Sequence, residues 1–438
     1  DYDAPGGRVA NSWVDLSAYG AGLAYVGADS FVGASVKRTE TDYGVPFAPG
    51  GEAVAITLAQ TRYDLRSERP LALGPVERLR FSVGHADYEH AEIDLDTGET
   101  GTVFRSQGTE GRVELVQGER DGWQGALGVQ GLSRDLEAIG EEAFVPPVEI
   151  AEVGGFVLQR LDRETFGVEG GLRVDRRRLS TADARRAFTN VSASAAVFAR
   201  PADGWFASLS LAHNRRAPTE FELFADGPHA GTGAYEIGDA GLKSERVTSL
   251  EATVHWTGAR TRLDLHAFAS RFSGFIDQSP SGEILDDLPV YRFVQTGAAF
   301  TGGEIEVGYE AWRRGEATLR LEGGGDVVRG ETDLGRPART PPWSLSARAV
   351  WDSPRLNAEL EARRVGEQTR TAAFETPTGG HTLVNAKATF RPRADSDLRL
   401  FIEGRNLTDA AAREHASFLK DVAPLPGRSL RAGAAFAF

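Results

Sequence analysis

Two segments near the end of the chain decide its fold class: Leu398-Arg-Leu-Phe-Ile-Glu-Gly404 and Leu430-Arg-Ala-Gly-Ala-Ala-Phe-Ala-Phe438. In both segments apolar residues occupy every second position. A period of two, with an apolar and a polar face, is typical of a β-strand between two different environments. The second segment also ends on an aromatic residue, as strands do whose tips lie in the aromatic girdle of a membrane interface. Together they predict a transmembrane strand pair.

The same alternation recurs along the chain. It is clearest in residues 250–256, 317–321, 345–351 and 356–362. A soluble sandwich would show alternation too, but three further features favour a membrane barrel. The polar faces are dense in charge, Trp and Phe gather at strand ends, and the connections alternate between short and long. The short turns are 119–122, 162–164, 201–204, 257–260, 313–316 and 352–355, and the long loops are 137–148, 179–187, 215–243, 277–289, 330–341, 370–380 and 407–427.

Counting these segments predicts a large all-β, antiparallel transmembrane barrel of about nineteen strands, spanning residues 1–438. If the last strand runs inward, back-counting makes the first strand, about residues 12–27, inward-running as well. Bacterial single-chain barrels have even strand numbers. We therefore expect that at least one N-terminal strand lies outside this chain.

Composition excludes several other classes of protein. The chain has no apolar run long enough for a transmembrane helix. It has no Cys, which excludes thiolate metal sites, and its net charge of −14 disfavours nucleic acid as a partner. Acidic outer loops would instead raise the local concentration of cations. We find no nucleophile elbow, His-Glu-x-x-His or phosphate loop, so we do not expect an enzyme.

Several motifs resemble those of TonB-dependent outer-membrane receptors. The terminal ones are Asn406-Leu-Thr-Asp409, Arg413-Glu-His-Ala-Ser-Phe-Leu-Lys-Asp421 and Pro424-Leu-Pro-Gly-Arg428, and the stretch 215–229 resembles the family's mid-barrel loop. The resemblance implies a bacterial outer-membrane receptor with a 22-stranded barrel. It also implies an N-terminal plug that engages the TonB complex, and this chain shows neither plug nor TonB box.

Three further stretches are similar to the subgroup of this family associated with zinc uptake. They are Tyr88-Glu-His-Ala-Glu92, Gly140-Glu-Glu-Ala-Phe-Val-Pro-Pro147 and Gly227-Pro-His229. Without Cys, a zinc site would use His nitrogens and carboxylate oxygens. The resemblance therefore predicts a metal-capture site on the outer loops.

The candidate ligands lie on two of the predicted outer loops. They are His229, Asp226, Glu222 and Glu236 on the longest loop, and Glu141 and Glu142 on another. The alternative is that these acids form a solvated loop face and that His229 is a turn residue. On the inward face of a strand we expect His266 and Asp264 to line the lumen, His266 within a wall hydrogen-bond network. We expect a loop-packing role for His415.

The sequence leaves three functions open. The first is uptake of a scarce metal, with zinc as the transported ligand and no firm cofactor. The second is uptake of a metal chelate such as a siderophore or haem, and the third is passive diffusion through a porin. In each case we expect a monomer in outer-membrane lipid.

Overall fold

The computed structural model describes residues 1–47, 51–140, 143–229, 231–394 and 397–436. Its elements are β1 (Tyr2–Ala4), β2 (Gly7–Val9), β3 (Val14–Val26), β4 (Phe31–Val45), β5 (Val54–Leu73), β6 (Val76–Asp94), β7 (Thr100–Arg120), β8 (Trp123–Gly140), β9 (Val148–Asp162), β10 (Phe166–Ser180), β11 (Arg185–Ala199), β12 (Trp205–Arg216), α1 (Glu220–Phe224), β13 (Asp226–His229), β14 (Ala234–Ile237), β15 (Glu245–Thr257), β16 (Thr261–Leu285), β17 (Leu288–Arg314), β18 (Ala317–Thr332), β19 (Ser344–Asp352), β20 (Leu356–Val365), β21 (His381–Phe390), β22 (Leu398–Arg405) and β23 (Ser429–Phe436).

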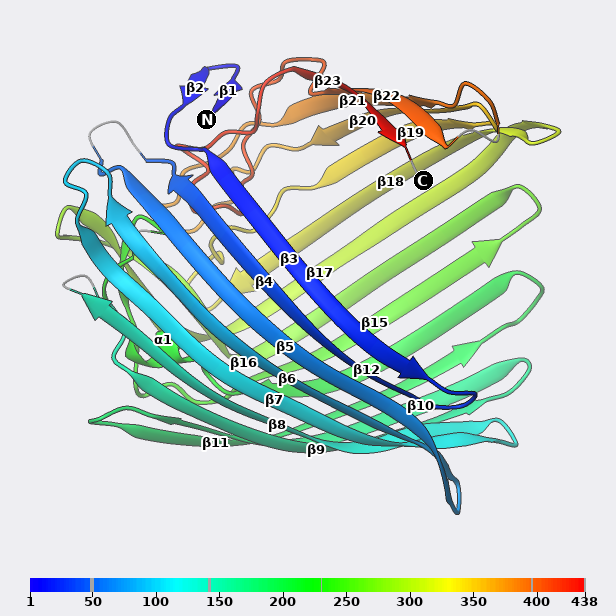
Figure 1. Ribbon diagram of the computed structural model, residues 1–438, viewed down its shortest axis with the longest axis horizontal. Coiled ribbons are helices and arrows are strands. Elements are labelled where there is room, and N and C mark those ends of the chain that lie inside the picture. The colour runs from blue at the N-terminus through cyan, green and yellow to red at the C-terminus, as the bar shows by residue number, and fades with distance from the viewer. Residues whose placement is uncertain (48–50, 141–142, 230, 395–396, 437–438) are drawn as a thin grey trace.

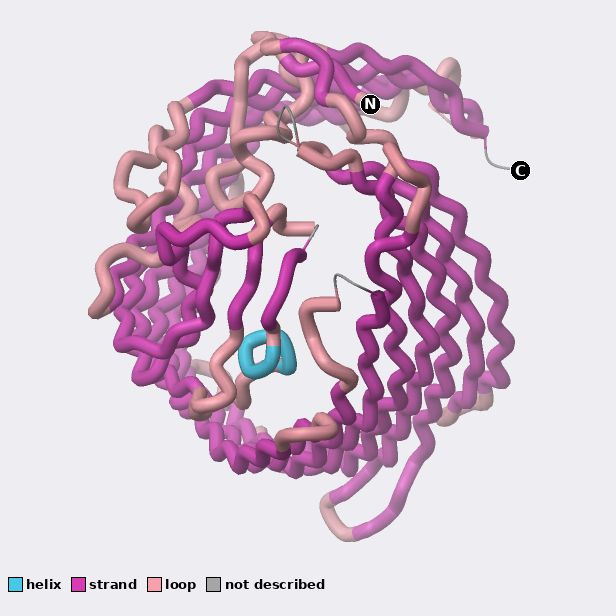
Figure 2. Tube along the Cα trace, turned by 90° about the vertical axis from the view of Figure 1, so that its left-hand side faces the viewer, coloured by secondary structure: helices cyan, strands magenta, loops and turns pink. Residues whose placement is uncertain are grey.

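The strands form a barrel, as the sequence predicts. Within the described residues the main sheet holds 21 strands. Nineteen of them, β3–β12 and β15–β23, form the wall and pair antiparallel in chain order, with β12 joined directly to β15. Figure 2 shows the barrel along its axis. The first and last wall strands, β3 and β23, face each other across the seam of the barrel. Among the described residues, β3 pairs with β4 and β23 pairs with β22.

The predicted strand directions agree with the pairing. Because each of the nineteen wall strands is antiparallel to the next, β3 and β23 run the same way (Figure 1). Beside the seam, the short β1–β2 hairpin is held against the last long loop. The Tyr2 hydroxyl donates to the Pro424 carbonyl at 2.6 Å, and the Gly427 N–H donates to the Asp3 carbonyl at 2.8 Å.

The short turns and the aromatic strand ends lie at one end of the barrel. Asp121 and Gly122 join β7 to β8 with positive φ angles of 52° and 77°, as a two-residue hairpin turn requires. Next to such turns Trp205 pairs with Trp256 and Trp312 stacks on Trp351, with ring centroids 5.8 and 5.2 Å apart. These rings form part of an interfacial girdle. Phe438, predicted to join it, lies outside the described residues.

Two of the predicted long loops are wrong in form. Residues 277–289 are not a loop, because β16 and β17 continue to a tight turn at Asp286 and Asp287. Beyond Ser273 of β16 and before Ala298 of β17, these strands extend past β15 and β18 and go on pairing with each other, so regular pairing continues where the neighbouring wall strands have ended. Residues 215–243 are not a free outer loop either. The part after β12 folds into the barrel, where α1 lies inside the ring of strands (Figure 2).

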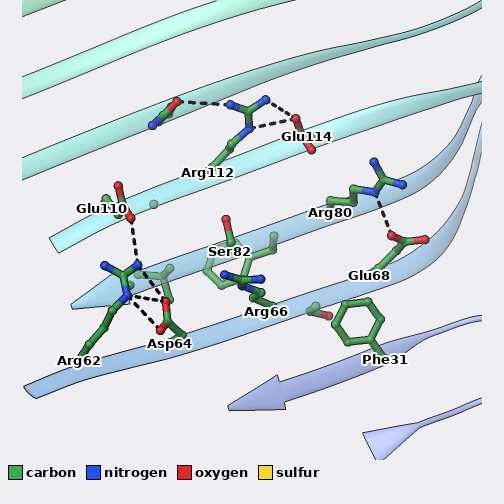
Figure 3. A pocket seen from close by; sticks show the side chains of 16 residues that line it. Phe31, Arg62, Asp64, Arg66, Glu68, Arg80, Ser82, Glu110, Arg112 and Glu114 are labelled. Carbon is green, nitrogen blue, oxygen red and sulfur yellow. Dashed lines mark hydrogen bonds and ion pairs between the residues drawn. The ribbon is translucent and has the colours of Figure 1, made fainter. Parts of the chain in front are cut away.

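The inner wall carries paired charges. On β5, β6 and β7 the guanidinium of Arg62 bonds the carboxylates of Asp64 and Glu110 at 3.0 and 3.1 Å, and Arg80 bonds Glu68 at 2.9 Å (Figure 3). These side chains line a recess of about 350 Å³. No helix among the described residues is both long and apolar enough to cross a membrane.

Candidate functional site

Residues 217–229 and 231–244, called here the inner segment, carry the predicted metal ligand His229 into the barrel. The segment begins with α1, whose Thr219 side chain accepts the Glu222 N–H at 3.2 Å while the Glu222 carboxylate accepts the Thr219 N–H at 2.8 Å. This reciprocal cap fixes the first turn. This helix was not predicted, although Thr219-x-x-Glu222 is the sequence signature of such a cap.

The inner segment is anchored by an apolar core inside the barrel. Its buried members Leu223, Ala225 and Leu242 pack with buried residues of the wall and of the loop before β9. Those are Phe104, Leu136, Ala138, Phe144, Val145, Val148, Ile150, Leu179, Phe188 and Ile276. From the charge on the polar strand faces, we predicted a wide aqueous lumen. On β7–β11, at the height of the inner segment, the inner face is apolar instead, because it packs against protein.

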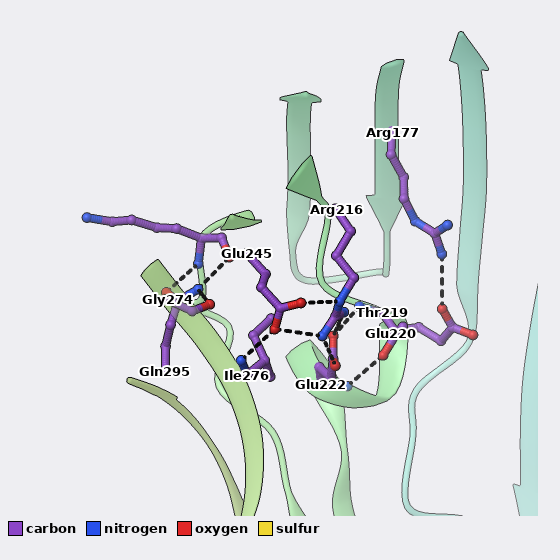
Figure 4. A network of polar contacts seen from close by, with 10 residues as sticks. Arg177, Arg216, Thr219, Glu220, Glu222, Glu245, Gly274, Ile276 and Gln295 are labelled. Carbon is purple, nitrogen blue, oxygen red and sulfur yellow. Dashed lines mark hydrogen bonds and ion pairs between the residues drawn. The ribbon is translucent and has the colours of Figure 1, made fainter. Parts of the chain in front are cut away.

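Ion pairs fix the same segment to the wall. The Glu220 carboxylate, 4% exposed, pairs with Arg134 of β8 and, at 3.4 Å, with Arg177 of β10. Arg216 at the end of β12 lies between two carboxylates, Glu222 at 2.8 Å and Glu245 at 3.0 Å (Figure 4). The inner segment is therefore held on both sides of α1.

His229 ends β13 and meets one of the five carboxylates near it in sequence, which are Glu220, Glu222, Asp226, Glu236 and Asp239. Its Nδ1 lies 2.9 Å from Oε1 of Glu236 on β14, and Glu236 is buried. Burial acts to raise the pKa of the Glu236 carboxyl, but the hydrogen bond and charge of His229 and the bond from Thr232 outweigh it and lower that pKa. Glu236 therefore presents a carboxylate to the imidazole. The imidazole ring of His229 also stacks on the Phe144 ring, with ring centroids 4.5 Å apart.

The remaining candidate ligands do not surround His229. Glu222 is engaged by Arg216, and Asp226 is exposed and accepts the Tyr235 hydroxyl at 3.4 Å. Glu141 and Glu142 lie outside the described residues, although the same loop reaches His229 through Phe144. Among the side chains that the structure describes, no group of three or more His, Asp or Glu is arranged to hold a metal ion. The described part of the site is the His229–Glu236 pair.

His266 and Asp264 both lie on β16, and their side chains contact β15. His266 is 3.2 Å from the Thr253 hydroxyl, and its ring meets that of His255 edge-on at 5.3 Å. Asp264, 5% exposed, pairs with His255 and accepts from Arg262 at 2.6 Å. This is a hydrogen-bonded network along the wall.

One further cluster, around Glu375, was not predicted. Its Oε1 accepts the Arg339 N–H at 2.8 Å and contacts Lys420 at 3.0 Å and His415 at 3.3 Å, while its Oε2 accepts the Ala372 N–H at 3.0 Å. Burial acts to raise the Glu375 pKa, but these donors outweigh it and lower the pKa from 4.5 to about 2. One carboxylate thus ties together the outer loops 333–343, 366–380 and 406–428. His415, 2% exposed, has the position that a loop-packing role requires.

Comparison with known families gives one match over most of the chain. Residues 11–407 match the family described as TonB dependent receptor-like, beta-barrel. The match covers nearly all of the barrel wall.

Solved structures share the fold at low sequence identity. The copper transporter OprC aligns over 100% of this chain and 73% of its own, with a TM-score of 0.85 and 17% identity. The FrpB iron transporter from Neisseria meningitidis aligns over 99% of this chain and 74% of its own, with a TM-score of 0.79 and 15% identity. The Serratia marcescens hemophore receptor HasR aligns over 97% and 71%, with a TM-score of 0.71 and 16% identity.

Proposed function

The chain belongs to the TonB-dependent receptor β-barrel family, whose members are transporters of the Gram-negative outer membrane, and from this premise we propose that it takes up a scarce metal, most specifically zinc. The metal would be captured in the lumen, at the inner segment. His229 and Glu236 would supply the first imidazole nitrogen and carboxylate oxygen. The pair 2.9 Å apart is the observation that carries the proposal.

The position of this pair supports capture of a cation. The inner segment is fixed to the wall, so the pair is held in place and is not presented on a free loop. The Glu236 carboxyl is charged at neutral pH, because its pKa is lowered. An ion that binds there would replace the hydrogen bond between the two side chains.

The choice of zinc rests on ligand chemistry. With Cys 0 and Met 0, the chain offers no thiolate or thioether, which are the ligands that select monovalent copper. Imidazole with carboxylate suits zinc and other borderline divalent ions. The structural relatives include a copper transporter and an iron transporter, and neither identifies the metal that this chain would bind.

Movement of the metal across the membrane would need further parts. We propose that a plug domain closes the barrel and couples it to the TonB complex, with the receptor working as a monomer in outer-membrane lipid. The inner wall, with its paired charges, would then face the plug.

Zinc titration by calorimetry on the full-length receptor tests this function. We expect His229→Ala to weaken zinc binding at least 10-fold, because it removes the imidazole, and Glu236→Gln to do so as well. His213→Ala is the matched control, since His213 lies on β12 and bonds Thr248 at 3.0 Å, away from the inner segment. Equal zinc affinity in wild type and His229→Ala would contradict the proposed site.

A further inference from the structure

The outer surface of β10 changes from apolar to basic toward the end of the strand. Because Arg177 pairs with the inner segment inside the barrel, the even-numbered residues of β10 face outward. The outward residues Leu172 and Val174 are 47% and 44% exposed, and they belong to the lipid-facing band. The next two outward residues are Arg176 and Arg178, and both are exposed. The change therefore comes at the border of the lipid-facing band that lies away from the short turns.

The neighbouring strands repeat this change. On β12 the outward residues Leu209 and Leu211 are exposed, and the last outward residue of the strand is Arg215. Arg216 beside it points inward, since it pairs with Glu222 of α1. Residues directly opposite each other in a sheet share a face, so the strand registers place arginines of β11, β15 and β16 on the same surface. We call the whole set the arginine belt: Arg176, Arg178, Arg185, Arg215, Arg246 and Arg271.

The belt carries positive charge without acidic partners. Within the described residues none of its six members forms an ion pair, and the outward positions of β10–β12, β15 and residues 261–273 of β16 hold neither Asp nor Glu. Arg215 and Arg246 even stand directly opposite each other, and the Arg215 guanidinium donates to His213 at 3.4 Å. Like charges directly opposite destabilise a sheet. An anion between the two arginines would remove this repulsion.

The same border has a different charge pattern on β6–β8. Because Arg62 bonds Glu110 of β7 inside the barrel, the odd-numbered residues of β7 face outward, and among them is exposed Arg105. Its guanidinium pairs with Glu89 of β6 at 2.7 Å, and Asp87 beside Glu89 is also exposed. Arginines there are already neutralised by carboxylates. Unpaired positive charge is therefore a property of the belt and not of the whole border.

We propose that the arginine belt binds the phosphate groups of anionic lipids in the outer leaflet of the membrane. A guanidinium binds phosphate through two parallel hydrogen bonds, and basic residues at a membrane surface attract anionic headgroups. The belt lies on the long-loop side of the lipid-facing band, where the headgroups of the outer leaflet meet the barrel. The apolar side chains next to it, such as Val174 and Leu211, would contact the acyl chains of the same lipids. This favours a lipid over free phosphate, and it does not depend on the transported metal.

The belt also has a mechanical consequence. Its six arginines lie on five neighbouring wall strands, and three of these strands hold the inner segment through Arg177, Arg216 and Glu245. Lipids bound along the belt would fix the depth of this part of the wall in the membrane.

Native mass spectrometry of the full-length receptor in a neutral detergent tests this inference with defined lipids. We expect phosphatidic acid to bind about 10-fold more tightly than zwitterionic phosphatidylcholine, because only its headgroup carries net negative charge. Replacing Arg176, Arg178 and Arg185 together with Gln should weaken phosphatidic acid binding about 10-fold. Arg105→Gln is the matched control, since Arg105 is exposed at the same border and already paired with Glu89. It should leave the affinity for phosphatidic acid unchanged.

The like-charged pair gives a second test that does not count bound lipids. In neutral detergent without added lipid, the double variant Arg215→Gln, Arg246→Gln should unfold at the same temperature as wild type or higher, because it removes the repulsion. Phosphatidic acid should raise the unfolding temperature of wild type more than that of the double variant.

Four outcomes would overturn the inference. They are equal affinity of wild type for phosphatidic acid and phosphatidylcholine, unchanged phosphatidic acid binding in the triple variant, an equal loss of binding in Arg105→Gln, and an equal rise of the unfolding temperature in wild type and the double variant. Inorganic phosphate at equal concentration should not displace the bound phosphatidic acid. If it does, the belt is a site for free phosphate and the assignment to lipid is wrong.

Discussion

Replacing Glu220 with Ala should release the inner segment from the barrel wall. The change removes the carboxylate that pairs with Arg134 and Arg177, and Arg134 then has no carboxylate partner within the described residues. Leaving one member of a buried ion pair uncompensated costs about 3 kcal/mol, at the low end of the usual range because the Arg134 side chain is one-third exposed. Amide exchange at Leu223 and Ala225 should accelerate about 100-fold.

A matched control separates the ion pair from a general effect of charge. Glu251 is an exposed carboxylate of β15 with no partner among the described residues, so Glu251→Ala should leave exchange at α1 unchanged. In Glu220→Gln the rate of amide exchange at α1 should lie between the rates in Glu220→Ala and Glu251→Ala, since the glutamine side chain keeps one hydrogen bond to an arginine. If Glu220→Ala protects Leu223 and Ala225 as well as wild type does, the apolar core alone holds the inner segment.

The wall strands could be predicted from sequence because two solvents act on them. Lipid outside and water inside force a period of two, so Leu319 and Leu321 of β18 fall on one face and Arg320 on the other. Turn chemistry at Asp121-Gly122 then marks where one strand ends and the next begins. These signals lie within a few residues of each other.

The inner segment and the Glu375 cluster could not be predicted, because their contacts link distant residues. Arg134 and Glu220 are 86 positions apart, and Glu375 and Lys420 are 45 apart. No local pattern distinguishes these carboxylates from the solvated acids around them. The candidate metal site shows the same limit, since five acids near His229 looked equivalent in sequence and the fold brings only Glu236 to it within the described residues.

We expect the Glu375 carboxylate to stabilise the outer loops at neutral pH and to lose this effect in acid. Its folded-state pKa is lowered from 4.5 to about 2. A lowered pKa means that the stabilisation is fully present above pH 4.5 and is lost as the pH falls toward 2. The shift corresponds to about 3 kcal/mol. Glu375→Gln should therefore weaken the junction of the three loops by about this amount at pH 7.

Limited trypsin digestion at pH 7 measures the loosening. We expect Glu375→Gln to be cut after Arg370 at least 10-fold faster than wild type, because Lys420 and His415 lose their shared carboxylate and the loop 366–380 opens more often. Glu367→Gln is the control on the same loop, since Glu367 is exposed and its side chain has no described partner. As the pH is lowered from 4.5 to 2, the difference in amide-exchange rate between wild type and Glu375→Gln should shrink. A difference that stays constant across that range would show that the Glu375 carboxylate charge does not hold the loops together.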